Sequence, residues 1–412
     1  MTMGLFEIIA VLISLAALFS YLNERFIRLP ATIALMLIAL LMSLGLIALD
    51  FMGLGVAEHA EAMLAQVDFN KALMHGMLSF LLFAGALHVN LDDLASQKWV
   101  ISLLATVGVV ISTFVVGLLS WWLLGRLGIN LPLIYCLLFG ALISPTDPIA
   151  VLGIIKTANA PKSLATKITG ESLFNDGIGV VVFVVIFSIA VEGHGASAAG
   201  ILELLLMEAG GGILFGLLVG GLAYYLLKQV DNYSVEILIS LAVVTGGYAL
   251  AEALYVSAPI TVVVAGLLIG NHGRLLAMSA HSREHLDTFW ELMDEVLNAV
   301  LFVLMGLEIL VLSFSSAYVV AGVLLIPIVL LARLVSVGIP VILLRLRRRF
   351  SPHVIKVMTW SGLRGGISVA LALSIPPGPE RDVILVATYV VVVFSILVQG
   401  LTIARLLKAT KA

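Results

Sequence analysis

The sequence has 412 residues, of which 61% are hydrophobic and only 11% are charged, and its mean hydropathy is +1.17. A soluble chain of this length would carry about a quarter charged residues, so the composition excludes a water-exposed globule and indicates surroundings that are mostly lipid. The formal net charge of −3 says little about partners, and the single cysteine, Cys136, excludes a disulfide framework and a cysteine-based metal site.

Long apolar runs follow one another along the whole chain. A bilayer core of ~30 Å needs about 20 mostly apolar residues for each helix that crosses it. The runs predict an all-α membrane protein with about 13 transmembrane helices, called spans one to thirteen in chain order. Their approximate limits are 4–22, 30–49, 72–89, 99–124, 131–155, 163–191, 198–227, 234–254, 257–270, 296–314, 317–344, 353–375 and 382–405.

The basic residues orient these spans. If the N-terminus lies outside, seventeen Lys and Arg residues fall in cytoplasmic segments, and only Lys71, Arg126 and Arg381 fall outside. Cytoplasmic loops of membrane proteins carry such an excess of Lys and Arg. We therefore expect an external N-terminus and a cytoplasmic C-terminus.

The longest polar stretch lies around 271–295. Leu286, Phe289, Trp290 and Met293 fall on one side of a helix drawn through it, with charged residues elsewhere. The pattern predicts an amphipathic cytoplasmic helix that serves as an interfacial connector.

Span five contains the sequence Ser144-Pro145-Thr146-Asp147-Pro148. Two prolines three residues apart cannot both sit in an unbroken helix, because each removes an amide hydrogen and clashes with the preceding turn. A charge at mid-membrane costs ~2.5–3.5 kcal/mol even on the lenient scale, so Asp147 is expected to be retained for a reason. We predict a break here that is buried in protein or lines a cavity.

Span six carries a second polar cluster, Gly170-Glu171-Ser172-Leu173-Phe174-Asn175-Asp176-Gly177. Ser172 and Asp176 are four residues apart and therefore share one face of the helix, and Glu171 and Asn175 form the adjacent stripe. The spacing predicts that these side chains face the same region of the protein.

Span twelve contains a glycine-rich interruption with a charge, Gly362-Leu363-Arg364-Gly365-Gly366. Because spans five and twelve are seven apart in order, they run through the membrane in opposite directions. This predicts inverted repeats with two broken helices that cross near mid-membrane, as in secondary transporters.

The charges within the spans do not cancel. Asp147, Glu171 and Asp176 give −3, and Arg333 and Arg364 give +2. If all five share one region, the remaining −1 can be balanced by one monovalent cation or one proton. The sum suggests that a cation and a proton compete for one carboxylate in electroneutral exchange.

Five motifs occur in order over nearly the whole chain: Ser-Pro-Thr-Asp-Pro (144–148), Gly-Glu-Ser-Leu-Phe-Asn-Asp-Gly (170–177), Ala-Arg (332–333), Gly-Leu-Arg-Gly-Gly (362–366) and Val-Gln-Gly-Leu-Thr-Ile (398–403). Together they resemble the NhaP-type sodium/proton antiporters of the monovalent cation:proton antiporter-1 family. The resemblance implies a homodimer with an interface domain and a six-helix core that moves the ion. It divides the chain into interface helices one to three (1–95), core helices four to six (96–193), interface helices seven to ten (194–315) and core helices eleven to thirteen (316–412).

The resemblance also implies roles for the polar residues of spans five and six. Asp176 would be the carboxylate for which Na⁺ and protons compete. Ser172 and the carbonyl oxygen of Thr146 would be further Na⁺ ligands, and Glu171 would lie beside the ion.

Four residues would hold the site together by the same resemblance. Arg333 would pair with the glutamate of span six, and Asp147 would offset the dipoles of the half-helices at the crossing. Asn175 would tie span six to this crossing, and Arg364 would stabilise the break in span twelve.

The sequence thus predicts a secondary active transporter that exchanges Na⁺ or Li⁺ for H⁺ by alternating access, not an enzyme, with no cofactor and no nucleic-acid partner. Its partners would be monovalent cations, protons and membrane lipid. The absence of a long cytoplasmic tail favours the plasma membrane of a prokaryote. A K⁺/H⁺ antiporter of the same fold and a cation channel remain alternatives. An intramembrane aspartyl protease would need a Gly-x-Gly-Asp motif, and an ATP-driven pump a phosphate-binding Gly-x4-Gly-Lys-Ser/Thr loop; the sequence contains neither.

Overall fold

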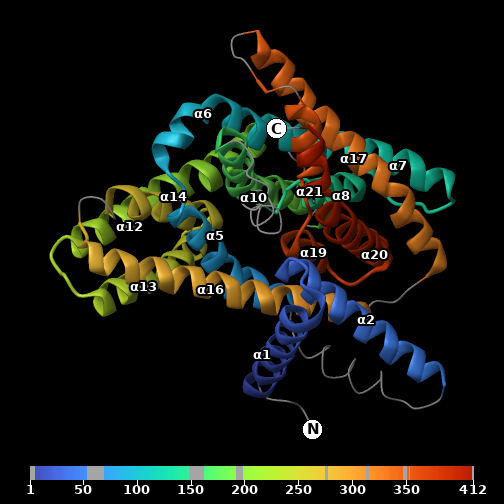
Figure 1. Cartoon of the computed structure of the whole chain (residues 1–412). Helices are drawn as coiled ribbons and strands as arrows, with labels where there is room; N and C mark the ends of the chain where they lie inside the picture. The colour runs from blue at the N-terminus through green and yellow to red at the C-terminus, as the bar shows by residue number, and fades with distance from the viewer. Residues whose placement is uncertain are drawn as a thin grey trace.

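The computed structural model describes residues 5–52, 69–147, 162–191, 198–273, 277–311, 315–346, 350–351 and 353–410. These residues form helices joined by short connections, and no strand occurs among them (Figure 1). The expected all-α fold is therefore confirmed.

The helices of the first half begin where the sequence provides start signals. Pro30 and Pro132 immediately precede α2 and α8, where a missing amide hydrogen costs little. The Asn90 side chain caps α6 by accepting hydrogen bonds from two amides of its first turn. The bounds are α1 (Leu5–Leu22), α2 (Ala31–Phe51), α4 (Phe69–Lys71), α5 (Leu78–Leu87), α6 (Leu91–Leu103), α7 (Val109–Arg126), α8 (Leu133–Ile143) and α10 (Lys162–Val191).

The second half continues in the same way. Ser257 and Ser279 cap α14 and α16 through their hydroxyl oxygens. The bounds are α11 (Ala198–Leu205), α12 (Gly211–Leu227), α13 (Tyr233–Ala253), α14 (Ala258–Leu268), α16 (Ala280–Leu307), α17 (Ser316–Arg345), α18 (Val354–Trp360), α19 (Gly366–Leu373), α20 (Pro379–Phe394) and α21 (Gly400–Thr410). Short π-helical or 3₁₀ segments extend or join them: η1 (Asn23–Ile27), η2 (Ala72–Met77), η3 (Leu104–Gly108), η4 (Leu206–Gly210), η5 (Ile269–Gly273), η6 (Glu308–Leu310) and η7 (Ser395–Gln399).

Within the residues that the structure describes, eight helical stretches are long and apolar enough to cross a membrane, and each coincides with a predicted span. They are Phe6–Ile27, Ala31–Asp50, Leu91–Arg126, Lys162–Val191, Glu203–Leu227, Tyr233–Ala253, Ser316–Arg345 and Pro379–Thr410. Shorter apolar helices at Ala72–Leu87, Leu133–Ile143 and Ala258–Gly273 coincide with spans three, five and nine. The chain thus contains multiple membrane-spanning helices, while the count of thirteen and the orientation stay predictions.

The amphipathic segment differs from its prediction. It is not a separate connector, because α16 runs without a break from Ala280 into the predicted span ten. No glycine or proline occurs in α16 before Gly306, so nothing in the sequence stops the helix. Leu286 and Trp290 are fully buried against α13 and α14, as their shared face predicted.

The helices pack in two groups with α10 between them. In one group α7 packs against α8 and α17, and α17 packs against α20. In the other, α12 packs against α13 and α14, while α16 packs against α2, α5 and α13. Helix α10 contacts α6 and α8 on one side and α14 on the other, which places its polar cluster inside the protein.

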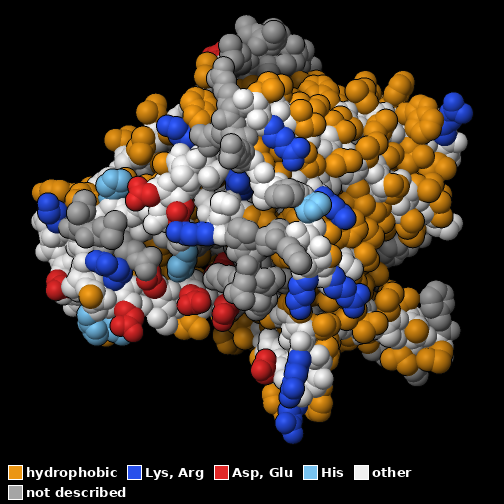
Figure 2. Space-filling model, turned by 45° about the horizontal axis from the view of Figure 1, so that its top comes forward, with side chains coloured by type: hydrophobic (Ala, Val, Ile, Leu, Met, Phe, Trp, Pro, Cys, Tyr) orange, Lys and Arg blue, Asp and Glu red, His pale blue; other side chains and the backbone are white. Residues whose placement is uncertain are grey.

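A broad hydrophobic surface covers the right-hand part of the face shown in Figure 2, whereas charged side chains gather on its left and centre. Large apolar side chains such as Phe114 and Trp121 of α7 and Leu218 and Leu222 of α12 are exposed. Exposed apolar patches of this size mark contact with a membrane or a partner protein, as expected for helices that face lipid.

Candidate functional site

The predicted break in span five is present. Helix α8 ends at Ile143, and residues 144–147 continue as non-helical chain. Pro148 and the rest of span five lie outside the described residues. The amide of Asp147 donates a 2.8 Å hydrogen bond to the carbonyl oxygen of Leu363 in span twelve.

The predicted break in span twelve is also present, between α18 and α19. From this break the buried Arg364 donates hydrogen bonds through Nη1 to the carbonyl oxygens of Ser144 (2.6 Å) and Pro145 (2.8 Å). These oxygens lie at the C-terminal end of α8, where unpaired carbonyls carry partial negative charge. The guanidinium therefore neutralises an end of a broken helix and brings the two breaks together.

Asn175 and Ser172 of α10 both bind Thr146 of the first break. The Asn175 amide accepts from the Thr146 main-chain nitrogen (3.2 Å) and donates to the Thr146 hydroxyl (2.9 Å). The hydroxyls of Ser172 and Thr146 are 3.0 Å apart, and all three side chains are buried. Ser172 and Asn175, from two adjacent stripes of α10, thus both contact the non-helical chain of span five.

Glu171 and Arg333 form a buried, two-pronged ion pair. Arg333 donates through Nη1 to Oε1 of Glu171 and through Nη2 to Oε2 at 2.9 Å, and Nη2 also reaches the carbonyl of Met358 at 3.2 Å. The exposed fractions are 1% for Glu171 and 6% for Arg333. A carboxylate held in this geometry is already neutralised, which leaves Asp176 as the less satisfied carboxylate of α10.

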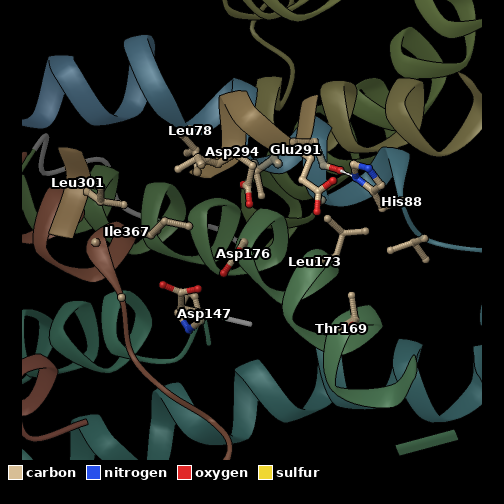
Figure 3. A pocket seen from close by; sticks show the side chains of 18 of the residues that line it. Leu78, His88, Asp147, Thr169, Leu173, Asp176, Glu291, Asp294, Leu301 and Ile367 are labelled. Atoms are coloured by element: carbon tan, nitrogen blue, oxygen red, sulfur yellow. Dashed lines mark hydrogen bonds between the residues drawn. The ribbon is translucent and has the colours of Figure 1, made fainter. Parts of the chain in front are cut away.

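Asp176 faces a cavity of about 820 Å³ together with Asp147 (Figure 3). Its side chain is 5% exposed and receives no hydrogen bond from any residue that the structure describes. A desolvated carboxylate without such donors binds a proton or a small hard cation favourably. The same carboxylate can therefore bind either a proton or a metal cation.

The other wall of the cavity is formed by α5 and by an acidic stretch of α16. Figure 3 shows Glu291 and Asp294 directed from α16 into the cavity, opposite Asp176. The ion pair between Asp93 and Lys162 (2.7 Å) also lines the cavity, and the Lys162 side chain is 78% exposed. The cavity therefore reaches the protein surface at the start of α6 and α10.

The sequence model of the family described as sodium/hydrogen exchanger, transmembrane, matches residues 12–409. The chain belongs to the sodium/hydrogen exchanger family. Within this family, it is 51% identical to the Na⁺/H⁺ antiporter NhaP of Pseudomonas aeruginosa over 407 residues, which cover 98% of this chain and 96% of that protein. It is 35% identical to the Na⁺/H⁺ antiporter NhaH of Halobacillus dabanensis over 408 residues, with 97% and 96% covered.

The fold is similar to a solved structure of the sodium proton antiporter MjNhaP1 from Methanocaldococcus jannaschii at pH 8. The TM-score is 0.78, the sequence identity is 20%, and the match covers 98% of each chain. The family resemblance of the five motifs is confirmed, and so is an all-helical fold like that of MjNhaP1. The division into interface and core domains stays a prediction.

Two features of this sodium/hydrogen exchanger were not predicted from the sequence. Glu291, Asp294 and Glu295 line the cavity, although the sequence indicated only that the charged residues of their helix lie away from its apolar side. Their spacing of three and four residues was a usable signal, because it places them on one side of a helix. Ser395, just before the last motif, and Gln399, within it, contact the break in span twelve, and no sequence argument assigned them a role.

Proposed function

We propose that this chain is a secondary active transporter that exchanges Na⁺, or Li⁺, for H⁺ across the membrane. The observation that carries the proposal is the buried Asp176 carboxylate, which faces a cavity next to two helix breaks held together by Arg364. The names of the relatives support it, because NhaP and NhaH are both Na⁺/H⁺ antiporters.

Sodium and the proton compete for Asp176. Na⁺, stripped of most of its water, binds oxygens of Asp176, Ser172 and Thr146, with Glu171 close by, because hard cations prefer oxygen ligands. Protonation of Asp176 removes the negative charge and releases the ion. The bidentate pairing of Glu171 with Arg333 supports this division of roles, because a paired carboxylate is a poor competitor for the cation.

The exchange is electroneutral, with one cation for one proton. Among the charges of the central motifs and Arg333, those of Glu171 and Arg333 cancel in one pair. Asp147 and Arg364 lie on the two contacting breaks, and their opposite charges leave Asp176 with the one net charge. Asn175 cannot take up a second proton, and it is engaged with Thr146.

The ion moves by alternating access of a core domain against an interface domain. The core consists of 96–193 and 316–412, and the interface domain of 1–95 and 194–315. Spans five and twelve are broken helices that cross in an inverted repeat. The hydrogen bonds between their breaks and the contacts of α7 and α8 with α17, α19 and α20 support this division.

With the N-terminus outside and thirteen spans, Lys162 and the first half of α16 lie on the cytoplasmic side. The cavity reaches the surface at Lys162, so the structure corresponds to the inward-facing state. The protein works as a homodimer in the plasma membrane of a prokaryote and takes monovalent cations and protons as substrates, with lipid around it.

The test is exchange by the purified protein in proteoliposomes that contain a pH-sensitive dye, with the membrane potential clamped. Gradients of Na⁺, Li⁺ and K⁺ are imposed in turn. We expect Na⁺ or Li⁺ to drive proton movement at a rate that does not depend on the potential, and Asp176→Asn to abolish it. The exposed Asp92→Asn variant serves as the matched control.

Each alternative has its own outcome in this assay. A larger response to K⁺ would indicate a K⁺/H⁺ antiporter. A single-channel conductance, recorded separately in a planar bilayer, would indicate a channel. Dependence of the rate on the potential would refute electroneutrality alone. Exchange at the wild-type rate in Asp176→Asn would refute the assignment of the site.

A further inference from the structure

The segment η7, between α20 and α21, is a π-helical turn that ends at the start of the fifth motif. π-Helical turns inside α-helices are rare and occur frequently at functional sites. Two polar side chains of η7, Ser395 and Gln399, are buried at 1% and 3% exposure. Neither belongs to the ion site or to the pair of Glu171 and Arg333, so their burial needs another reason.

Both side chains bind the break in span twelve. The Ser395 hydroxyl accepts a hydrogen bond from the main-chain amide of Arg364 (2.9 Å) and donates one to Oε1 of Gln399 (2.8 Å). Nε2 of Gln399 donates to the carbonyl oxygen of Trp360 at 3.1 Å. Since Trp360 is the last residue of α18 and Arg364 lies just before α19, the pair bridges the break from one side to the other.

This bridge of Ser395 and Gln399 across the break supplies partners for main-chain polar groups, which every broken membrane helix requires. The end of a helix leaves carbonyl groups without partners, and the chain after it leaves amides without partners. Inside a membrane protein no bulk water can satisfy them, so side chains must do so. Ser395 and Gln399 satisfy one group of each kind, and each side chain also satisfies the other.

The bridge acts on the ion site through Arg364. The guanidinium of Arg364 binds the carbonyl oxygens of Ser144 and Pro145, the two residues that precede Thr146. The position of this guanidinium depends on where the main chain of Arg364 is held, and Ser395 holds it. A displacement of Arg364 would therefore move the chain that carries the proposed sodium ligand Thr146.

We propose that Ser395 and Gln399 are positioning residues that set the sodium affinity of the transporter through Arg364. This inference rests on the proposed function. If the two residues only tied η7 to α18, their loss would lower stability and the amount of active protein. Exchange of every substrate would then fall by the same factor. A positioning role changes the KM for sodium while the maximal rate is largely kept, because the exchanging carboxylate itself is untouched.

The test is sodium-dependent exchange by Ser395→Ala in proteoliposomes, with KM and maximal rate measured separately. Loss of one buried hydrogen-bonding group predicts a KM about three- to tenfold above wild type. Ser395→Thr keeps the hydroxyl and should restore the wild-type KM. Thr402→Val is the matched control, because it removes the 2.9 Å bond from Trp360 Nε1, which joins α18 to α21 just after η7, without touching Arg364.

Gln399→Met provides the second variant. It removes the bond to the Trp360 carbonyl and the acceptor for Ser395 but leaves the hydroxyl free to hold Arg364, so a smaller rise in KM is expected. A wild-type KM in Ser395→Ala, or a rise in Thr402→Val as large as that in Ser395→Ala, would overturn the proposal. So would the failure of both Ser395→Ala and Gln399→Met to give folded protein, because the role would then be structural. Absence of exchange by the wild type would instead refute the proposed function.

Discussion

The main-chain amide of Asp147 donates a hydrogen bond to the carbonyl oxygen of Leu363, joining two helix breaks that lie far apart in the sequence. The guanidinium of Arg364 adds two bonds in the same place. Each break thus satisfies polar main-chain groups that the other leaves open, where water cannot do so. The surroundings of Asp176 depend on both breaks, so a change in either break should alter them.

Gly365 offers a test of this contact. A Cβ atom at this position would overlap the carboxylate of Asp147, so there is no space for a side chain. Gly365→Ala should force the two breaks apart, reduce exchange severely and lower stability by about 1–3 kcal/mol. Exchange in proteoliposomes and thermal unfolding in detergent measure the two effects. Gly246→Ala, in α13 with open space around it, is the control and should change neither.

The ion pair of Glu171 and Arg333 should be important for stability as well as for rate. Removal of one partner from a buried pair leaves the other charge uncompensated, at a cost of about 3–5 kcal/mol. Glu171→Gln and Arg333→Ala should therefore both lower the temperature of thermal unfolding and slow exchange. Asp93→Asn breaks the exposed pair with Lys162 and should cost less than about 1 kcal/mol. Full thermal stability of both buried-pair variants would contradict this role.

The helix breaks and the members of the site could be predicted because local rules determine them. Two prolines three residues apart must interrupt span five, and a spacing of four must place Ser172 and Asp176 on one face. The structure also brings Ser172 and Asn175 into contact with Thr146, which neither rule requires. The pairing of Glu171 with Arg333 was expected only from the family resemblance, because no local rule relates residues so far apart.

The acidic wall of the cavity and the contacts of Ser395 and Gln399 depend on tertiary packing, which a single sequence does not reveal. The sequence places the acidic residues of α16 only on the polar side of an amphipathic helix. In the structure this side faces Asp176 of α10 across the cavity (Figure 3). The bridge of Ser395 and Gln399 depends on a π-helical turn, and hydrophobic periodicity does not predict one.

Asp294 should increase the rate at which sodium reaches the site. It is directed into the cavity opposite Asp176, where its negative charge attracts cations. Asp294→Asn should raise the KM for sodium by about two- to tenfold at low ionic strength. The difference should shrink when choline chloride is added, because salt screens the field. Glu284→Gln, on an exposed part of the same helix, is the control. An increase in KM that is independent of salt would refute an electrostatic role.

The proposed competition of sodium and the proton for one carboxylate determines how sodium shifts the pH dependence of exchange. On the proposed mechanism sodium binds only the deprotonated form of Asp176, so raising the sodium concentration should extend activity to lower pH. For one cation against one proton, each tenfold increase in sodium above its KM should move the acidic midpoint by about one pH unit. The measurement is the rate of exchange against pH at several sodium concentrations. A midpoint that stays fixed would show that sodium and the proton occupy separate sites. A shift near half a unit would mean two protons for each sodium, which is incompatible with Asn175 beside a single titrating aspartate.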